Sequence, residues 1–73
     1  MLPYEVLFIV TRIRFGGYVF LTWAGDHTPR HVHVYRNGSL VAKWDLTSRR
    51  VMAGKASKRL RALLEQLEEE GRL

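Results

Sequence analysis

Apolar residues dominate two neighbouring segments near the start of the chain, residues 5–15 and 18–24, with the β-branched and aromatic composition of strands. Gly16-Gly17 separates them. Glycine tolerates the positive φ angles of a two-residue turn, so this pair predicts a β-hairpin. The residues predicted to lie opposite one another are Phe15 and Tyr18, Ile13 and Phe20, and Thr11 and Thr22. One face would hold Ile9, Ile13, Phe15, Tyr18 and Phe20, and the other Arg12, Arg14, Val19, Leu21 and Trp23.

A second hairpin is predicted around Asn37-Gly38, the dipeptide that most strongly favours a tight β-turn. Residues 31–36 alternate with a period of two before it, and residues 39–46 form the predicted return strand. The predicted opposite residues are Tyr35 and Leu40, His33 and Ala42, and His31 and Trp44. One face would then hold His31, His33, Tyr35, Leu40, Ala42 and Trp44. Because the other face, with Val32 and Val34, is also partly apolar, the pattern leaves open which face is covered.

The C-terminal segment has the period of an amphipathic helix. Its apolar stripe consists of Ala56, Leu60, Leu63, Leu64 and Leu67. Ser57 is a suitable N-cap and Gly71 a suitable stop, so a helix is predicted over residues 57–70. Residues 47–54 are predicted to form only the connection. The expected fold is one α+β domain over residues 1–73, a mostly antiparallel sheet of three or four strands with this helix packed on one face.

Length and composition narrow the class of protein. A chain of 73 residues without cysteine is a single small domain that has neither disulfides nor thiolate metal ligands. Its core is marginal in size, which favours a homodimer or a complex with another protein. No apolar run reaches about 18 residues and no signal-peptide pattern is present. We therefore expect no membrane segment and a cytoplasmic location.

Charge is unevenly distributed along the chain. Residues 1–64 carry 11 Lys and Arg against 3 Asp and Glu, a balance of +8, and residues 65–73 carry 1 Arg against 4 Glu, a balance of −3. A basic body favours polyanionic partners, RNA first. The predicted helix begins with cations and ends with glutamates, the reverse of what its dipole favours. Either its basic start binds phosphate, or the cost is small and screened by salt.

All three histidines fall between residues 27 and 33, in the pattern His27-x-x-x-His31-x-His33, with Asp26 beside the first. Residues two apart on a strand share a face, so His31 and His33 could bind one metal such as zinc, with His27 or Asp26 as a third ligand. The three imidazoles are equally candidate acid–base catalysts, because imidazole titrates near neutral pH. A purely structural role is the third interpretation.

RNA cleavage is the reaction considered for acid–base histidines. One imidazole would take the 2′-hydroxyl proton, another would protonate the leaving oxygen, and Arg30 or Arg36 would steady the phosphate. The candidate nucleic-acid contacts are Arg30, Arg36, Lys55, Lys58 and Arg59. The aromatic residues that could stack on bases, although strand aromatics more often lie in a core, are Tyr4, Tyr18, Trp23, Tyr35 and Trp44.

Four short strings resemble the small bacterial domain of unknown function 4160. They are Gly17-Tyr18-Val19-Phe20, Asp26-His27-x-Pro29-x-His31-Val32-His33-Val34, Lys43-Trp44-x-Leu46 and Gly54-x-x-Ser57. The likeness covers nearly the whole chain, and the His-x-Pro-x-His-Val-His-Val string is its specific part. The chain departs from the family pattern at Arg30, where a second proline is common, and in its basic helix start.

The resemblance implies candidate site residues His27, His31 and His33, with Asp26 and Pro29 shaping the loop, but no settled activity. Genes of the family often lie beside a second small protein similar to an antitoxin or regulator. The resemblance therefore implies a two-gene, toxin–antitoxin-like module with that protein as partner. We expect foremost a basic, RNA-directed component of such a module. The alternatives are a histidine metal-binding protein and a non-catalytic module that binds its gene neighbour.

Overall fold

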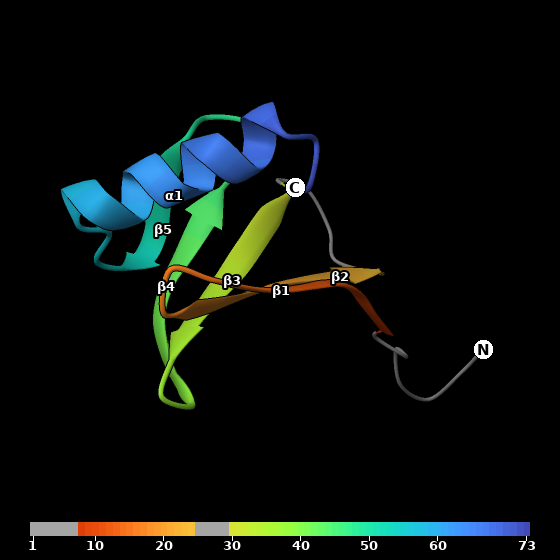
Figure 1. Ribbon diagram of the computed structural model, residues 1–73, viewed down its shortest axis with the longest axis horizontal. Coiled ribbons are helices and arrows are strands. Elements are labelled where there is room, and N and C mark those ends of the chain that lie inside the picture. Colours follow the sequence, from red (N-terminus) through yellow and green to blue (C-terminus); the bar gives the residue numbers. More distant parts are fainter. Residues whose placement is uncertain (1–7, 25–29) are drawn as a thin grey trace.

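Antiparallel strands follow one another in the order of the sequence and pair with their chain neighbours to form one meander. The computed structural model describes residues 8–24 and 30–73. Within them the elements are β1 (Phe8–Phe15), β2 (Tyr18–Ala24), β3 (His31–Arg36), β4 (Ser39–Asp45), β5 (Arg50–Gly54) and α1 (Lys58–Glu69). Figure 1 shows the β1–β2 hairpin crossing β3 and β4 steeply, with α1 lying over one side of the sheet.

The α+β class is confirmed, but the sheet has five strands rather than three or four. Residues 47–54, predicted as a connection, contain β5, which pairs antiparallel with β4. Its sequence, Arg-Val-Met-Ala-Gly, has one β-branched residue and no alternation. Because its strand conformation depends on hydrogen bonds to β4 rather than on its own composition, the local pattern could not reveal it.

The first hairpin forms as its glycines predict. Gly16 and Gly17 have φ angles of 59° and 87°. Phe15 pairs with Tyr18, Ile13 with Phe20 and Thr11 with Thr22, as expected. The register shifts between Ile9 and Thr11, where β1 carries a bulge. The predicted start of this strand at residue 5 lies outside the described residues.

The second hairpin departs from its predicted register three residues after the turn. Tyr35 pairs with Leu40 as expected, but the next pair is Val34 with Ala42, so Val41 is an extra residue in β4. The predicted pairs of His33 with Ala42 and of His31 with Trp44 are therefore wrong. His33 pairs with Lys43 and His31 with Asp45. A shift by one residue moves every later side chain of β4 to the opposite face.

Burial explains why this bulge is favourable. It places Val32, Val34, Ala42 and Trp44 on one face, where each is buried beneath α1. The unshifted register would instead have put Ala42 and Trp44 on the same face as the two imidazoles. Whichever face the helix then covered, polar rings would be buried or apolar side chains would be exposed, and both outcomes are unfavourable.

The backbone of the bulge is itself satisfied. The amide N–H of Lys55 donates to the carbonyl oxygen of Val41 at 3.2 Å. Gly54, with φ 75°, makes this approach possible, because a Cβ at that position would overlap the Val41 carbonyl group. Gly54 therefore allows the end of β5 to lie against the bulge.

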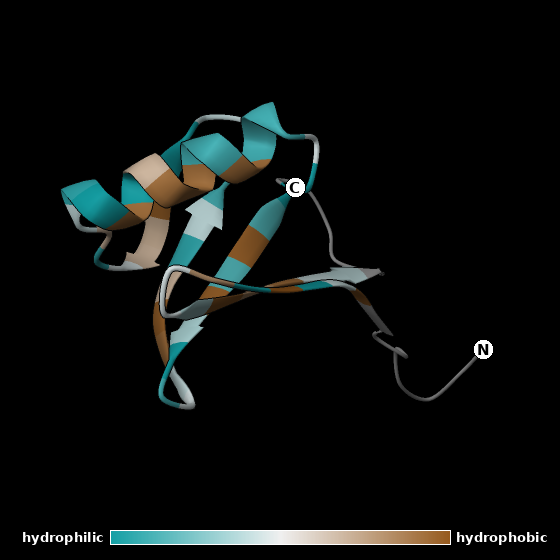
Figure 2. Ribbon diagram, in the orientation of Figure 1, coloured by the Kyte–Doolittle hydropathy of each residue, from teal (hydrophilic) through white to brown (hydrophobic). Residues whose placement is uncertain are grey.

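The helix begins and ends close to its predicted limits. Ser57 is the N-cap, and its Oγ accepts a hydrogen bond from the backbone N–H of Leu60 at 3.0 Å. Leu60, Leu64 and Leu67 are buried, each stabilising the fold by about 1.5–3 kcal/mol. Gly71 has φ 70°, as a glycine following a helix often does. Figure 2 shows the apolar side of α1 facing the sheet and the polar side facing outward.

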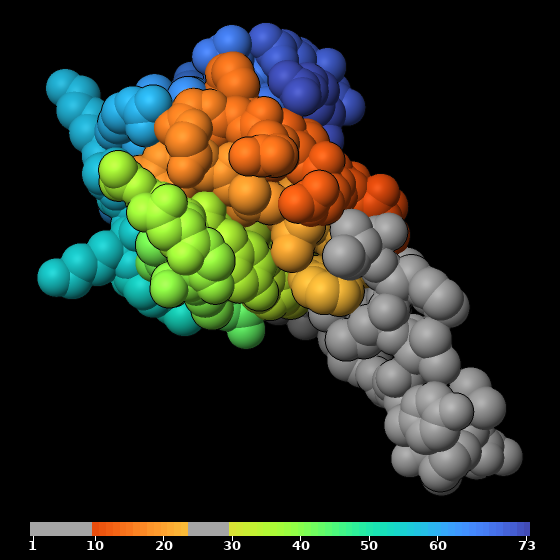
Figure 3. Space-filling view, turned by 60° about the horizontal axis from the view of Figure 1, so that its bottom comes forward, coloured from red at the N-terminus to blue at the C-terminus, as the bar shows by residue number. Residues whose placement is uncertain are grey.

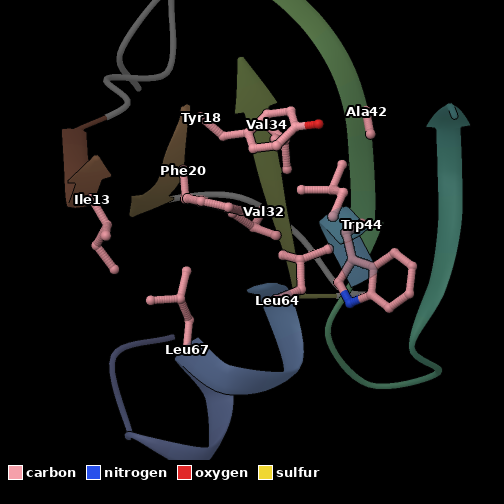
Figure 4. Close-up of a cluster of buried hydrophobic side chains, with 10 residues drawn as sticks. Ile13, Tyr18, Phe20, Val32, Val34, Ala42, Trp44, Leu64 and Leu67 are labelled. Carbon is pink, nitrogen blue, oxygen red and sulfur yellow. The ribbon is translucent and has the colours of Figure 1, made fainter. Parts of the chain in front are cut away.

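These leucines complete a core to which every element except β5 contributes a fully buried or nearly buried residue. The members of this core are Ile13, Tyr18, Phe20, Val32, Val34, Ala42, Trp44, Leu60, Leu64 and Leu67. Figure 4 shows their side chains converging between the strands and α1. The Nε1 of Trp44 has no hydrogen-bond partner among the described residues. The core thus occupies one face of the sheet and leaves the other face for polar groups.

The role of Gly54 can be tested against a glycine of similar conformation. Gly38 has φ 78° and open space around its Cβ position. Gly38→Ala should cost about 1–2 kcal/mol from the left-handed backbone alone. Gly54→Ala should cost about 1–3 kcal/mol more, because the new methyl group overlaps the Val41 carbonyl. Urea denaturation measures both free energies of unfolding, and equal losses would contradict the proposed contact.

Candidate nucleic-acid interface

The face of the sheet opposite α1 is covered by no other helix or strand of the described chain. We call it the open face. Its residues on β1 to β4 include Arg12, Arg14, Val19, Leu21, Trp23, His31, His33, Tyr35, Leu40, Lys43 and Asp45. The two arginines and Leu40 are exposed and the others are partly buried. A surface that combines aromatic rings, imidazoles and cations in this way suits a ligand with both flat apolar groups and negative charge.

One row of paired residues crosses four strands of the open face. Arg12 pairs with Leu21, Leu21 with His33, and His33 with Lys43. Adjacent strands lie about 4.8 Å apart, so the two cations flank the imidazole across about 14 Å of sheet. The row therefore places positive charge on both sides of His33.

The two described histidines lie next to each other on β3. Their ring centroids are 4.9 Å apart and the rings are tilted by 58°. The indole of Trp23, from β2, lies edge-on to His33, and its Nε1–H donates to Nδ1 of His33 at 3.1 Å. Three rings from two strands are thus held together on the open face.

The hydrogen bond from Trp23 restricts the protonation of His33. Indole nitrogen is only a donor, so Nδ1 of His33 must accept. A neutral imidazole that accepts at Nδ1 carries its hydrogen on Nε2. A second proton on Nδ1 would place two donors against each other, so the bond favours the neutral Nε2–H form of His33.

Asp45 forms the acidic neighbour of this cluster, across from His31 in the sheet. Its Oδ1 accepts the backbone N–H groups of Ser48 at 3.1 Å and Thr47 at 2.8 Å. The pKa of Asp45 is lowered, chiefly by the hydrogen bond from the Ser48 backbone, with further contributions from Thr47 and from the charge of His31, against an opposing effect of desolvation. Asp45 therefore serves the turn that leads into β5.

Only part of the predicted histidine site falls on described residues. His31 and His33 are brought together, whereas Asp26, His27 and Pro29 lie outside the described ranges. Residues 8–24 and 30–73 contain no group of three His, Cys, Asp or Glu that could hold a metal ion. The three-histidine catalytic site and the zinc site with His27 or Asp26 remain predictions.

The five cations predicted to contact nucleic acid separate into two groups. Arg30 lies beside the histidine pair and lines a hollow of about 160 Å³ with Trp23 and His31. Arg36 is at the other end of β3, about 20 Å away along the strand. Lys55, Lys58 and Arg59 lie between β5 and the first turn of α1, and Lys55 shares a hollow with Arg36.

Arg12, Arg14 and Lys43 were not among the predicted nucleic-acid contacts, yet they lie on the open face with the histidines. The sequence did indicate the position of Arg12 and Arg14, because they alternate with Ile13 and were therefore predicted on the face opposite the apolar face of their hairpin. Lys43 could not be assigned, because its position depends on the bulge at Val41. Of the two predicted stacking residues on the second hairpin, Tyr35 reaches the open face and Trp44 lies in the core.

Sequence comparison places this architecture in a known family. A family model with the description Domain of unknown function (DUF4160) matches residues 16–72. The chain belongs to this family. The DUF4160 match includes β2 to β5 and α1, and thus both described histidines. No curated protein and no solved structure matches the chain. In the described part of this DUF4160 domain, no helix is long and apolar enough to cross a membrane.

The protonation state of His33 can be read from the ring nitrogens. In the native protein, ¹⁵N spectra at neutral pH should show His33 predominantly as the Nε2–H tautomer. Trp23→Phe removes the donor and keeps an aromatic ring, so the spectrum of His33 should move towards a mixture of tautomers, at a stability cost of about 1 kcal/mol. An unchanged His33 spectrum in Trp23→Phe would show that Trp23 does not set the tautomer.

The lowered pKa of Asp45 predicts an acid-dependent contribution to stability. A carboxyl group with a lowered pKa in the folded state stabilises the protein above its unfolded pKa of about 3.9, and this contribution disappears as the pH falls through the folded pKa. Asp45→Asn should therefore melt below the native protein at pH 7, and the difference should narrow below about pH 4. Melting curves from pH 7 to 3 measure it; a constant difference would be the contrary result.

Proposed function

We propose that this domain is an RNA-directed protein that binds single-stranded RNA on its open face. The observation that carries the proposal is the close set of Trp23, His31 and His33 between Arg12 and Lys43. Stacking of one base on an aromatic side chain contributes about 1–3 kcal/mol, and flanking cations neutralise the phosphates. Both kinds of contact are available within one row and its neighbour.

Single-stranded RNA fits this surface better than a duplex or a protein does. Bases must be unstacked before they can reach rings that lie within a sheet, and single strands provide such bases. Protein–protein interfaces are enriched in aromatic residues and arginine but depleted in lysine at their centre. On the open face the central row has a cation at each end, Arg12 and Lys43. The described carboxylates are Asp45, which lies opposite His31, and four glutamates in or beside α1.

The histidines further support RNA cleavage as the reaction. In such a step the 2′-oxygen forms a bond to phosphorus and the bond from phosphorus to the 5′-oxygen breaks. One imidazole takes the 2′-hydroxyl proton and a protonated imidazole supplies a proton to the 5′-oxygen. Because the Nδ1 of His33 accepts from Trp23, its ring is held neutral with the hydrogen on Nε2 and suits neither role. We therefore assign the base to His31 and the protonated imidazole to His27, the third predicted histidine. Arg30, which lines the same hollow as His31, is the proposed phosphate contact.

We place this activity in a two-gene, toxin–antitoxin-like module in the cytoplasm. The support for this setting is the resemblance of the histidine string to a family whose genes often adjoin an antitoxin-like protein. That protein is the proposed partner. The small size of the core, in a chain of 73 residues without cysteine, also supports association with a partner or a second copy.

Fluorescence distinguishes stacking on the open face from general attraction to RNA. The chain has two tryptophans, Trp23 on the open face and Trp44 in the core. In Trp44→Phe, an oligouridine of about 12 nucleotides should quench the remaining Trp23. In Trp23→Leu, Trp44 should not be quenched and the affinity should fall about tenfold, because one base can no longer stack. Trp44→Phe removes a donor without a described partner, so it should fold.

The same samples test the reaction. RNA cut by the native protein should yield a 2′,3′-cyclic phosphate and a 5′-hydroxyl, and His31→Ala should lower the rate by about 100-fold or more. Gln66→Ala, on the exposed side of α1, is the matched control. Absence of RNA binding at low salt would refute the function, and unchanged cleavage in both His31→Ala and His33→Ala would refute the role of the histidines.

A further inference from the structure

Two hollows meet at the end of the molecule where both hairpins turn. The first, of about 550 Å³, lies between the Gly16-Gly17 and Asn37-Gly38 turns. The second, of about 380 Å³, lies between Arg36 and the residues that precede α1. Tyr18 lines both hollows. Figure 3 shows the tips of the two hairpins and the start of α1 side by side at this end.

The charged groups around these hollows are all cationic. Arg12 and Arg14 line the first hollow, and Arg36 and Lys55 line the second. Among the described residues, no carboxylate lines either hollow. By contrast, Glu65 and Glu68 line a separate hollow beside Trp44. The carboxylates of residues 8–24 and 30–73 thus line neither hollow at the hairpin tips.

Tyr18 holds two of the cations in place. The guanidinium carbon of Arg36 lies 5.7 Å from the centre of its ring, and that of Arg59 lies 5.8 Å from the same centre. Arg59 also reaches the first turn, because a Cβ at Gly16 would lie 3.4 Å from its Nη2. Two guanidinium groups that share one ring repel each other, and an anion bound near both offsets that repulsion.

The charge order of α1 agrees with such a use. The first turn of the helix has no acidic residue and the last turn has no basic residue. This order is unfavourable for the helix dipole. The cations near the first turn therefore do not stabilise the helix, whereas Arg59 lies beside the Tyr18 ring, which lines both hollows.

We infer that Arg12, Arg14, Arg36, Lys55 and Arg59 form a hairpin-tip band that binds the sugar–phosphate backbone of RNA. The inference rests on the proposed function, since it extends the path of the same strand. Arg12 and Arg14 belong to both surfaces, so a strand whose bases lie on the open face can continue over the tips without leaving positive charge. The band reads no bases, because phosphate contacts carry no sequence information.

Salt dependence measures the band directly. For single strands, the slope of log K against log salt decreases in magnitude by about 0.7 for each phosphate that the protein no longer neutralises. Arg36→Gln/Arg59→Gln should therefore lower the slope by about 1.4, so that the fall in affinity between 50 and 200 mM salt becomes about sevenfold smaller. Arg36→Lys/Arg59→Lys keeps the charge and should keep most of the slope. The matched control is Arg49→Gln/Arg61→Gln, which removes equal charge at the separate hollow beside Trp44.

Two probes separate this inference from the proposed function. One is oligouridine, and the other is an oligonucleotide of equal length that lacks all bases. The native protein should bind both oligonucleotides. Arg36→Gln/Arg59→Gln, the band variant, should bind the abasic oligonucleotide more weakly than the native protein does. Equal slopes for Arg36→Gln/Arg59→Gln and for the Arg49→Gln/Arg61→Gln control would overturn the band, while Trp23 quenching by oligouridine would still uphold the open face. Binding of both probes without Trp23 quenching would uphold the band and overturn stacking. Melting curves confirm that each variant is folded.

Discussion

The extra residue at Val41 is the constraint on which this structure depends. It brings Ala42 and Trp44 to the same face as Val32 and Val34, so that the leucines of α1 can cover four apolar side chains of the second hairpin. The carbonyl of Val41 accepts the Lys55 N–H, and Gly54 leaves room for that contact. A bulge that buries apolar groups and satisfies its own backbone is a stable part of the fold rather than a defect.

The same shift creates the chemistry of the other face. Once β4 has moved by one residue, His33 lies opposite Lys43 and His31 opposite Asp45. The histidines therefore meet a cation and a carboxylate instead of Ala42 and Trp44. Trp23 adds a hydrogen bond to His33 from β2. Core packing and the properties of the open face are thus two results of one register, and a change in the bulge would alter both.

Local signals made most of the elements predictable, and long-range contacts set the rest. The Gly16-Gly17 and Asn37-Gly38 turns, the Ser57 cap and the spacing of the leucines each act within a few residues, so both hairpins and the helix could be located. The placement of His31 and His33 on one face follows from strand geometry in any register. The bulge depends on burial beneath α1 and β5 depends on pairing with β4, so neither leaves a local pattern. Because the bulge was not predicted, Lys43 could not be assigned to the open face from the sequence.

β1 joins the two proposed surfaces because its arginines share one face. Arg12 stands in the row of His33, and Arg14 stands opposite Val19, one row nearer the turn. Ile13, between them, is held in the core, which fixes the direction of both side chains. Tyr18 then begins the return strand, with its ring buried and with Arg36 and Arg59 beside it. Because the residues that orient these cations are core residues, the positive charge at the hairpin tips is organised by the fold itself. This fixed arrangement would lower the entropy cost of the proposed binding to a phosphate backbone.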